Sequence, residues 1–296
     1  MMQQGRRLQV ELGLLVVLAI LWGSSYLFMK VAVTEIPPLT LIACRVSIAA
    51  IFLVGVLWLT GDHLPRDRKT WQSLFVQSLL NSIGAWTLLA WGQQFVDASL
   101  TSVLNSTSPV FVFLITLLIT RHERAGWMKL AGALAGVAGV TLIVGVDALA
   151  GLGQQVAGQL AALASAGLYG AAAIYGRRFT NISAVATAAG TMLWSALILV
   201  PVSLVVDQPW TLDPSMRAMG AAGLLGLLCT GIAMILYFRL VQTLGAMGTA
   251  SQAYLRAGFG VFLGMIFLGE SITLVVAFGI ALAILGVALI NFPVRK

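Results

Sequence analysis

Charged residues are much scarcer in this chain than in a soluble protein. Only 9% of the 296 residues are Asp, Glu, Lys or Arg, while 59% are hydrophobic and the mean hydropathy is +0.98. A soluble globular domain carries about 25% charged residues. The composition therefore excludes that class and predicts an integral membrane protein whose surroundings are the lipid bilayer.

Cysteine, histidine and catalytic motifs are also scarce. Cys44 and Cys229 both fall in predicted membrane spans, so a disulfide framework or a metal site would lack partners. His63 and His122 fall in predicted loops, and the motifs of serine hydrolases, zinc proteases and P-loop proteins are absent. The basic residues behind the net charge of +7 are scattered in short clusters. We expect no enzyme, no metal, no cofactor and no nucleic-acid partner.

A long internal repeat organises the chain. The stretch A-S-L-T-S-V-L-N that begins at Ala98 recurs in degenerate form from Ala246, and Glu123 and Glu270 are 147 residues apart (270 − 123). The same shift relates three further pairs, which are Trp22 and Tyr169, Gly132 and Gly279, and Gly139 and Gly286. This period far exceeds the 20–50 residues of solenoids. We expect one transmembrane domain over residues 1–296, with repeat one at about 8–146 and repeat two at about 156–292.

The apolar runs predict membrane-spanning helices, because they are long and do not alternate as barrel strands do. The predicted spans are approximately residues 12–33, 39–60, 71–94, 98–120, 126–146, 156–177, 184–206, 216–238, 246–268 and 272–292. The predicted fold class is therefore all-α integral membrane. Gly-rich runs in the fifth and tenth spans predict close helix packing.

The distribution of basic residues predicts the topology. If the N-terminus is inside, 13 of the 17 basic residues lie in inside segments, namely Arg6, Arg7, Arg66, Arg68, Lys69, Arg121, Arg124, Lys129, Arg177, Arg178, Arg239, Arg295 and Lys296. The outside loops hold only Arg217. Because Lys and Arg in short loops set orientation, both termini are expected to be cytoplasmic. Five spans per repeat is an odd number, so the ten helices should form two inverted five-helix repeats around a central cavity, an architecture typical of alternating-access carriers.

Three basic residues fall within predicted spans. Lys30 and Arg45 lie close enough to the outer helix ends to extend their charges to that interface. Arg256 lies about 15 Å into the ninth span, near the bilayer centre, and no carboxylate is expected at its depth. It is a natural counter-ion for a substrate carboxylate. The alternative is a structural role in which backbone carbonyls or neighbouring amides satisfy the guanidinium.

Polar and aromatic residues at helical spacing predict the walls of the cavity. They lie in the third, fourth, eighth and ninth spans, and Gln252 is the equivalent of Asn105 under the shift of 147. The predicted cavity residues are Asn81, Trp86, Trp91, Thr101, Asn105, Ser108, Tyr237, Gln252, Tyr254 and Arg256. Pro109 is a predicted hinge. Small polar residues also hold packed helices together, so each position has a structural alternative.

With these residues in view, the chain resembles the drug/metabolite transporter superfamily, and within it the EamA family of ten-helix carriers. The resemblance covers essentially the whole chain and rests on W-G-S-S with Lys30, on Pro37 and Arg45, and on the L-G-E that ends at Glu270. It implies a bundle in which the third, fourth, eighth and ninth helices surround the cavity. It also implies export of amino acids, metabolites or cationic drugs.

The resemblance and the deep arginine together predict a bacterial inner-membrane carrier that exports aromatic or other neutral amino acids by alternating access. Two alternatives remain open. A multidrug efflux carrier for lipophilic cations would need a deep carboxylate, and a non-transporting membrane scaffold would show no substrate flux. The sequence does not indicate an oligomeric state.

Overall fold

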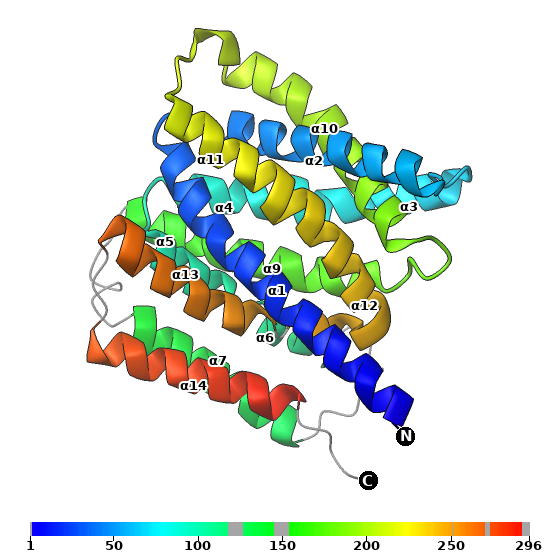
Figure 1. Ribbon diagram of the computed structural model, residues 1–296. Coiled ribbons are helices and arrows are strands. Elements are labelled where there is room, and N and C mark those ends of the chain that lie inside the picture. Colours follow the sequence, from blue (N-terminus) through cyan, green and yellow to red (C-terminus); the bar gives the residue numbers. More distant parts are fainter. Residues whose placement is uncertain (1, 118–126, 145–153, 251, 270–272, 292–296) are drawn as a thin grey trace.

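A computed structural model describes residues 2–117, 127–144, 154–250, 252–269 and 273–291, and in this part of the chain every regular element is helical. The helices form one bundle (Figure 1). Those of the first half are α1 (Met2–Val33), α2 (Pro38–Thr60), α3 (Arg68–Ser78), the π-helix η1 (Leu79–Trp86), α4 (Thr87–Gly92), α5 (Ala98–Asn105), α6 (Ser108–Ile115) and α7 (Trp127–Val144).

The second half continues the same pattern. Its elements are α9 (Gln154–Gly176), α10 (Ala184–Val206), the short 3-10 turn η3 (Pro209–Thr211), α11 (Met216–Gly226), the π-helix η4 (Leu227–Ile232), α12 (Ala233–Ala250), α13 (Gln252–Leu268) and α14 (Leu274–Asn291). Among the described residues, eight helical segments are long and apolar enough to cross a membrane. The helical fold class is confirmed at this level, while the count of ten spans and the inversion of the repeats stay predictions.

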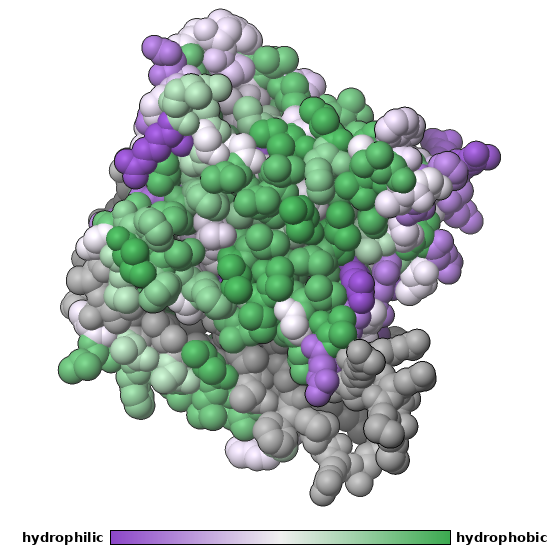
Figure 2. All heavy atoms as spheres, viewed as in Figure 1, coloured by the Kyte–Doolittle hydropathy of each residue, from purple (hydrophilic) through white to green (hydrophobic). Residues whose placement is uncertain are grey.

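The surface of the bundle is apolar across its middle. Figure 2 shows hydrophobic residues over most of the visible face, with hydrophilic residues gathered toward the two ends. Trp58, Leu197 and Val205 are among the large apolar side chains left exposed. A soluble monomer rarely exposes so continuous an apolar surface, whereas a bilayer covers it.

The two halves make equivalent contacts with each other. α2 packs on α10 and α7 on α14, and in each pair the partners are related by the shift of 147 residues. The contact of α1 with α13 likewise has its counterpart in that of α9 with α5 and α6. Trp22 and Tyr169 are repeat equivalents whose ring centroids are 6.0 Å apart. Ser106 and Ala253 are also equivalents, and the Ser106 hydroxyl donates to the Ala253 carbonyl at 2.6 Å.

The predicted close packing of the fifth and tenth spans is present in the α7 and α14 pair, which lie side by side (Figure 1). A Cβ atom added to Gly286 would lie 2.7 Å from the Gly132 carbonyl oxygen and 2.8 Å from the Gly136 nitrogen. Glycine at these positions therefore allows the two backbones to touch. Glu123 and Glu270, which helped to define the repeat, lie outside the described residues.

The fourth span is not the single helix 98–120 that the apolar run predicts. It breaks after Asn105, and α6 starts at Ser108 with Pro109 in its first turn. Proline has no N–H and clashes with the preceding turn of a helix, but it fits the first turn of a new one. The predicted hinge residue is thus located at a helix break.

The eighth span is longer than predicted, because α12 continues beyond residue 238 to Ala250. Gly245 has φ 76° and ψ 177°, a conformation that is essentially restricted to glycine. This residue therefore redirects the chain within α12.

We expect Gly245→Ala to lower the free energy of unfolding by about 1–3 kcal/mol, because a Cβ atom strains this backbone conformation. Thermal unfolding of the detergent-solubilised protein, followed by circular dichroism, measures the effect. Gly258→Ala is the matched control, since Gly258 lies within α13 with open space around its added Cβ. Equal melting temperatures for the two variants would contradict the assignment of strain to Gly245.

Candidate functional site

Arg256 lies on α13 in the interior of the bundle, and its side chain is 2% exposed. Its Nη2 donates to the Asn105 side-chain oxygen at 2.7 Å and to the Asn105 backbone oxygen at 3.3 Å. The backbone acceptor is available because the residue four positions later is Pro109, which has no N–H to donate. The helix break in the fourth span therefore produces one of the two contacts that hold this charge.

Asn105 joins several helices at this point. Its side-chain oxygen also accepts from the Tyr26 hydroxyl of α1 at 3.2 Å, and its Nδ2 donates to Ser165 Oγ of α9 at 3.0 Å. All four side chains are 5% exposed or less. One buried amide thus fixes α1, α5, α9 and α13 relative to one another.

Aromatic rings surround the Arg256 guanidinium. Its Cζ lies 5.7 Å from the ring centroids of Trp22 and Tyr26 and 5.5 Å from that of Tyr169. These distances are within the range of about 6 Å for cation–π attraction. The ring of Tyr237 extends the aromatic group, 5.2 Å from that of Trp22.

Arg45 is a second buried cation, and the expectation that it extends to the outer interface is wrong. Its side chain is 1% exposed, with Cζ 3.8 Å from the ring centroid of Trp86. Nε donates to Thr230 Oγ1 at 2.6 Å, and Nη2 lies 3.5 Å from the Cys229 carbonyl. The length of an arginine side chain permits either direction. Here the polar groups of η4 hold it inside.

The π-helical turn η4 makes the Cys229 carbonyl available. The N–H of Ala233 donates to Leu228 and Thr230 instead of to Cys229, its α-helical partner. The Cys229 carbonyl accepts the indole N–H of Trp22 at 3.1 Å as well as Arg45. Under the shift of 147 residues η4 falls within the equivalent of η1, so both halves place a π-helix at this depth. Such turns are frequent at functional sites.

Several buried polar atoms of the bundle have no hydrogen-bond partner among the described residues. They are Arg256 Nε, Asn81 Oδ1, Tyr237 Oη, Thr249 Oγ1, Gln252 Oε1 and both amide atoms of Gln77. Burying such a group without a partner costs about 1–3 kcal/mol. The interior of the bundle therefore holds both unused donors and unused acceptors.

The structure brings together some of the predicted cavity residues. Arg256 and Asn105 are bonded, Tyr237 packs on Trp22, and the indole N–H of Trp86 donates to the Tyr169 hydroxyl. Asn81, in η1, and Gln252, one turn before Arg256, are also buried.

The other predicted residues lie elsewhere or bond locally. Trp91 is 40% exposed and packs against Phe95, away from the two cations. The Thr101 hydroxyl donates to the Asp97 carbonyl within its own helix, and Ser108 is the first residue of α6. The side chain of Tyr254 lies outside the described part of the chain.

The sequence pattern does not single out Tyr26, Ser165 or Thr230, which contact the two buried arginines or Asn105. Trp22 and Tyr169 were recognised only as markers of the repeat. The structure shows that these two equivalent residues contact each other, with ring centroids 6.0 Å apart.

The chain has clear relatives. The model of the EamA-like transporter family matches residues 10–145 and again residues 156–292. The uncharacterized transporter YoaV of Bacillus subtilis is 27% identical over 97% of this chain and 98% of its own length. The uncharacterized inner membrane transporter YedA of Escherichia coli is 26% identical over 97% of this chain and 92% of its own length.

A solved crystal structure has the same fold. It superposes with a TM-score of 0.73 over 96% of both chains at 20% sequence identity. The two family matches coincide with the two halves inferred from the shift of 147 residues. This chain is therefore a multi-pass membrane protein that belongs to the EamA-like transporter family.

Proposed function

We propose that this protein is an inner-membrane carrier that exports aromatic or other neutral amino acids. The observation that carries the proposal is the pair of buried guanidiniums, Arg45 and Arg256, inside a group of aromatic rings. Neither makes an ion pair with a carboxylate of the described residues. A buried charge without a counter-ion is costly, so a ligand carboxylate that binds at this position is strongly stabilised by the guanidinium charge.

The unused polar atoms favour an amino acid over a simple carboxylic acid. Arg256 Nε can donate to the ligand carboxylate, while Asn81 Oδ1 and Gln252 Oε1 can accept from an ammonium group. The rings of Trp22, Tyr26 and Tyr169 offer a surface for an apolar or aromatic side chain. The three parts of a neutral amino acid thus each have a chemically matched group.

The relation of the two halves supports ten spans arranged as inverted repeats, with transport by alternating access. The repeat-equivalent contacts of Trp22 with Tyr169 and of Ser106 with Ala253 are those expected near a two-fold axis. Figure 1 places the start of α1 and the end of α14 at the same end of the bundle, which an even number of spans requires. In carriers of this type the substrate site lies between the repeats.

Polar contacts between the halves occur at both ends of the bundle. At the end where α1 begins, Arg239 Nη2 lies 2.9 Å from Glu11 Oε1, and the Ser183 hydroxyl donates to Asp62. At the opposite end, the Glu35 carboxylate accepts from both the N–H and the hydroxyl of Ser215 at 2.6 and 2.8 Å. Breaking one set while keeping the other would open the bundle from one side only.

The two alternative functions fit the site less well. A lipophilic cation would be repelled by Arg45 and Arg256, and the described residues offer no carboxylate beside them. A scaffold without transport leaves the unused polar atoms of the site without a role.

We expect Arg256→Ala to reduce uptake of radiolabelled phenylalanine and tryptophan into proteoliposomes at least tenfold, because the carboxylate loses its partner. Saturable uptake by the wild type is measured with and without an imposed pH gradient. Arg178→Ala is the control, because it removes an exposed arginine that stacks on Tyr175 at 3.8 Å. Normal uptake by the folded Arg256→Ala variant would contradict the role of Arg256 as the group that binds the substrate carboxylate. Gradient-driven transport of lipophilic cations alone would favour the efflux alternative.

We expect Asn105→Asp to raise the KM for amino acids at least tenfold, because an internal carboxylate then competes for Arg256. Asn105→Ala is the matched comparison, since it removes the same amide without adding a charge. The Asn105→Ala variant should have a lower melting temperature than the wild type, but its KM should rise less than that of Asn105→Asp. Similar KM values for the two folded variants would show that charge at this position does not govern substrate binding.

A further inference from the structure

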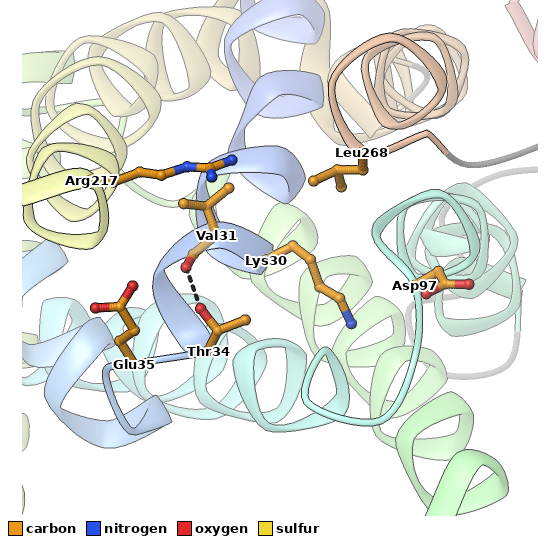
Figure 3. A pocket seen from close by; sticks show the side chains of 7 residues that line it. All are labelled: Lys30, Val31, Thr34, Glu35, Asp97, Arg217 and Leu268. Atoms are coloured by element: carbon orange, nitrogen blue, oxygen red, sulfur yellow. Dashed lines mark hydrogen bonds between the residues drawn. The ribbon is translucent and has the colours of Figure 1, made fainter. Parts of the chain in front are cut away.

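A pocket of about 350 Å³ opens at the end of the bundle where α1 ends, separate from the Arg45 and Arg256 cluster (Figure 3). Cavities that bind small molecules have volumes of about 300–1,000 Å³. Four charged residues line this one, namely Lys30, Glu35, Asp97 and Arg217. Val31 and Leu268 contribute apolar surface.

The charges are balanced and come from α1 and the turn after it, from the start of α5 and from α11. In Figure 3 the Arg217 guanidinium reaches from α11 over Val31, while the Lys30 side chain extends toward Asp97. Lys30 Nζ donates to the carbonyls of Gln93 and Val96, both at 2.9 Å, which uses two of its three N–H groups. Two cations and two carboxylates around one cavity match a zwitterion better than a ligand of one sign.

The Glu35 carboxylate is held in its ionised form. Hydrogen bonds from the Ser215 N–H and hydroxyl lower the pKa of Glu35, and Arg217 lowers it further. A carboxylate with a depressed pKa keeps its charge above its usual titration range and loses it only as the pH falls through the lowered value. Glu35 is therefore an anion at neutral pH and available to a ligand ammonium.

The pocket and the central cluster share the same three helices. Lys30 lies one turn beyond Tyr26 on α1, and Asp97 lies two turns before Asn105 at the start of α5. Leu268 ends α13, the helix of Arg256. Between the two sites the helices touch closely, since a Cβ added to Gly260 would lie 2.4 Å from Ser102 Oγ and 3.6 Å from the Tyr26 ring.

We infer that this pocket is a second binding site for a zwitterionic amino acid, occupied on the way between the central cluster and the solution at this end. The inference rests on the proposed function for its choice of ligand. Arg217 binds the carboxylate, Glu35 on the same side of the pocket binds the ammonium group, and Val31 and Leu268 contact the apolar side chain. Because its charged groups are partly hydrated, this site binds more weakly than the central one.

The test is equilibrium dialysis of radiolabelled phenylalanine against the purified wild type, Arg217→Gln and Arg256→Ala. We expect two sites in the wild type. In Arg217→Gln the weaker site should lose affinity at least tenfold, while in Arg256→Ala it should remain. Arg217 is exposed, so its variant is expected to fold, and Arg178→Gln is the control for loss of a surface charge.

The outcomes separate this inference from the proposed function. Suppose that the protein transports phenylalanine but has a single site, which Arg217→Gln leaves unchanged. This result overturns the assignment of the pocket as a binding site and leaves the proposed function standing. Suppose instead that the protein transports no amino acid but has a weak site, which Arg217→Gln removes. This result supports the assignment of the pocket as a binding site and overturns the proposed function. Retention of both sites in Arg217→Gln also overturns the assignment of the pocket.

Discussion

The contact of Arg256 with Asn105 is the constraint on which the centre of this bundle depends. A guanidinium in a low-dielectric interior must be compensated by hydrogen bonds or by an opposite charge. Here compensation comes from an amide, a backbone carbonyl and aromatic rings. All three are uncharged and leave the net charge in place. The site therefore keeps an electrostatic preference for an anion that an internal carboxylate would remove.

The two repeats have diverged in complementary ways at this contact. Under the shift of 147 residues, Arg256 is the equivalent of Pro109. In the first copy, proline withholds an N–H and leaves the Asn105 carbonyl without its helical donor. In the second copy, arginine supplies a donor that reaches that carbonyl. A symmetric ancestor could not have had both features at one pair of positions, so the contact depends on the divergence of the halves.

The sequence was a good guide to what depends on hydropathy along the chain. It located most of the helices and the repeat, because these follow from the length of apolar runs and from matching residues at a fixed spacing. It failed where the direction of a side chain decides the outcome. Arg45 is close to a helix end yet turns inward to Thr230 and Trp86. The helical spacing predicts Trp91 on the same face as Asn81. Trp91 instead faces outward, because the π-helix η1 shifts the register of the helix between them.

The two candidate binding regions differ in a way that suits passage of a zwitterion. The pocket at the end of α1 presents both signs of charge, partly in contact with water, so a ligand can keep most of its solvation there. The central cluster presents buried cations and neutral acceptors. The cations can meet a ligand carboxylate with a full opposite charge, whereas the neutral acceptors can meet an ammonium group only with their dipoles. Binding at the centre therefore costs more desolvation and gains more from the carboxylate. For the proposed amino-acid substrate, this difference favours discrimination at the centre and rapid exchange at the pocket.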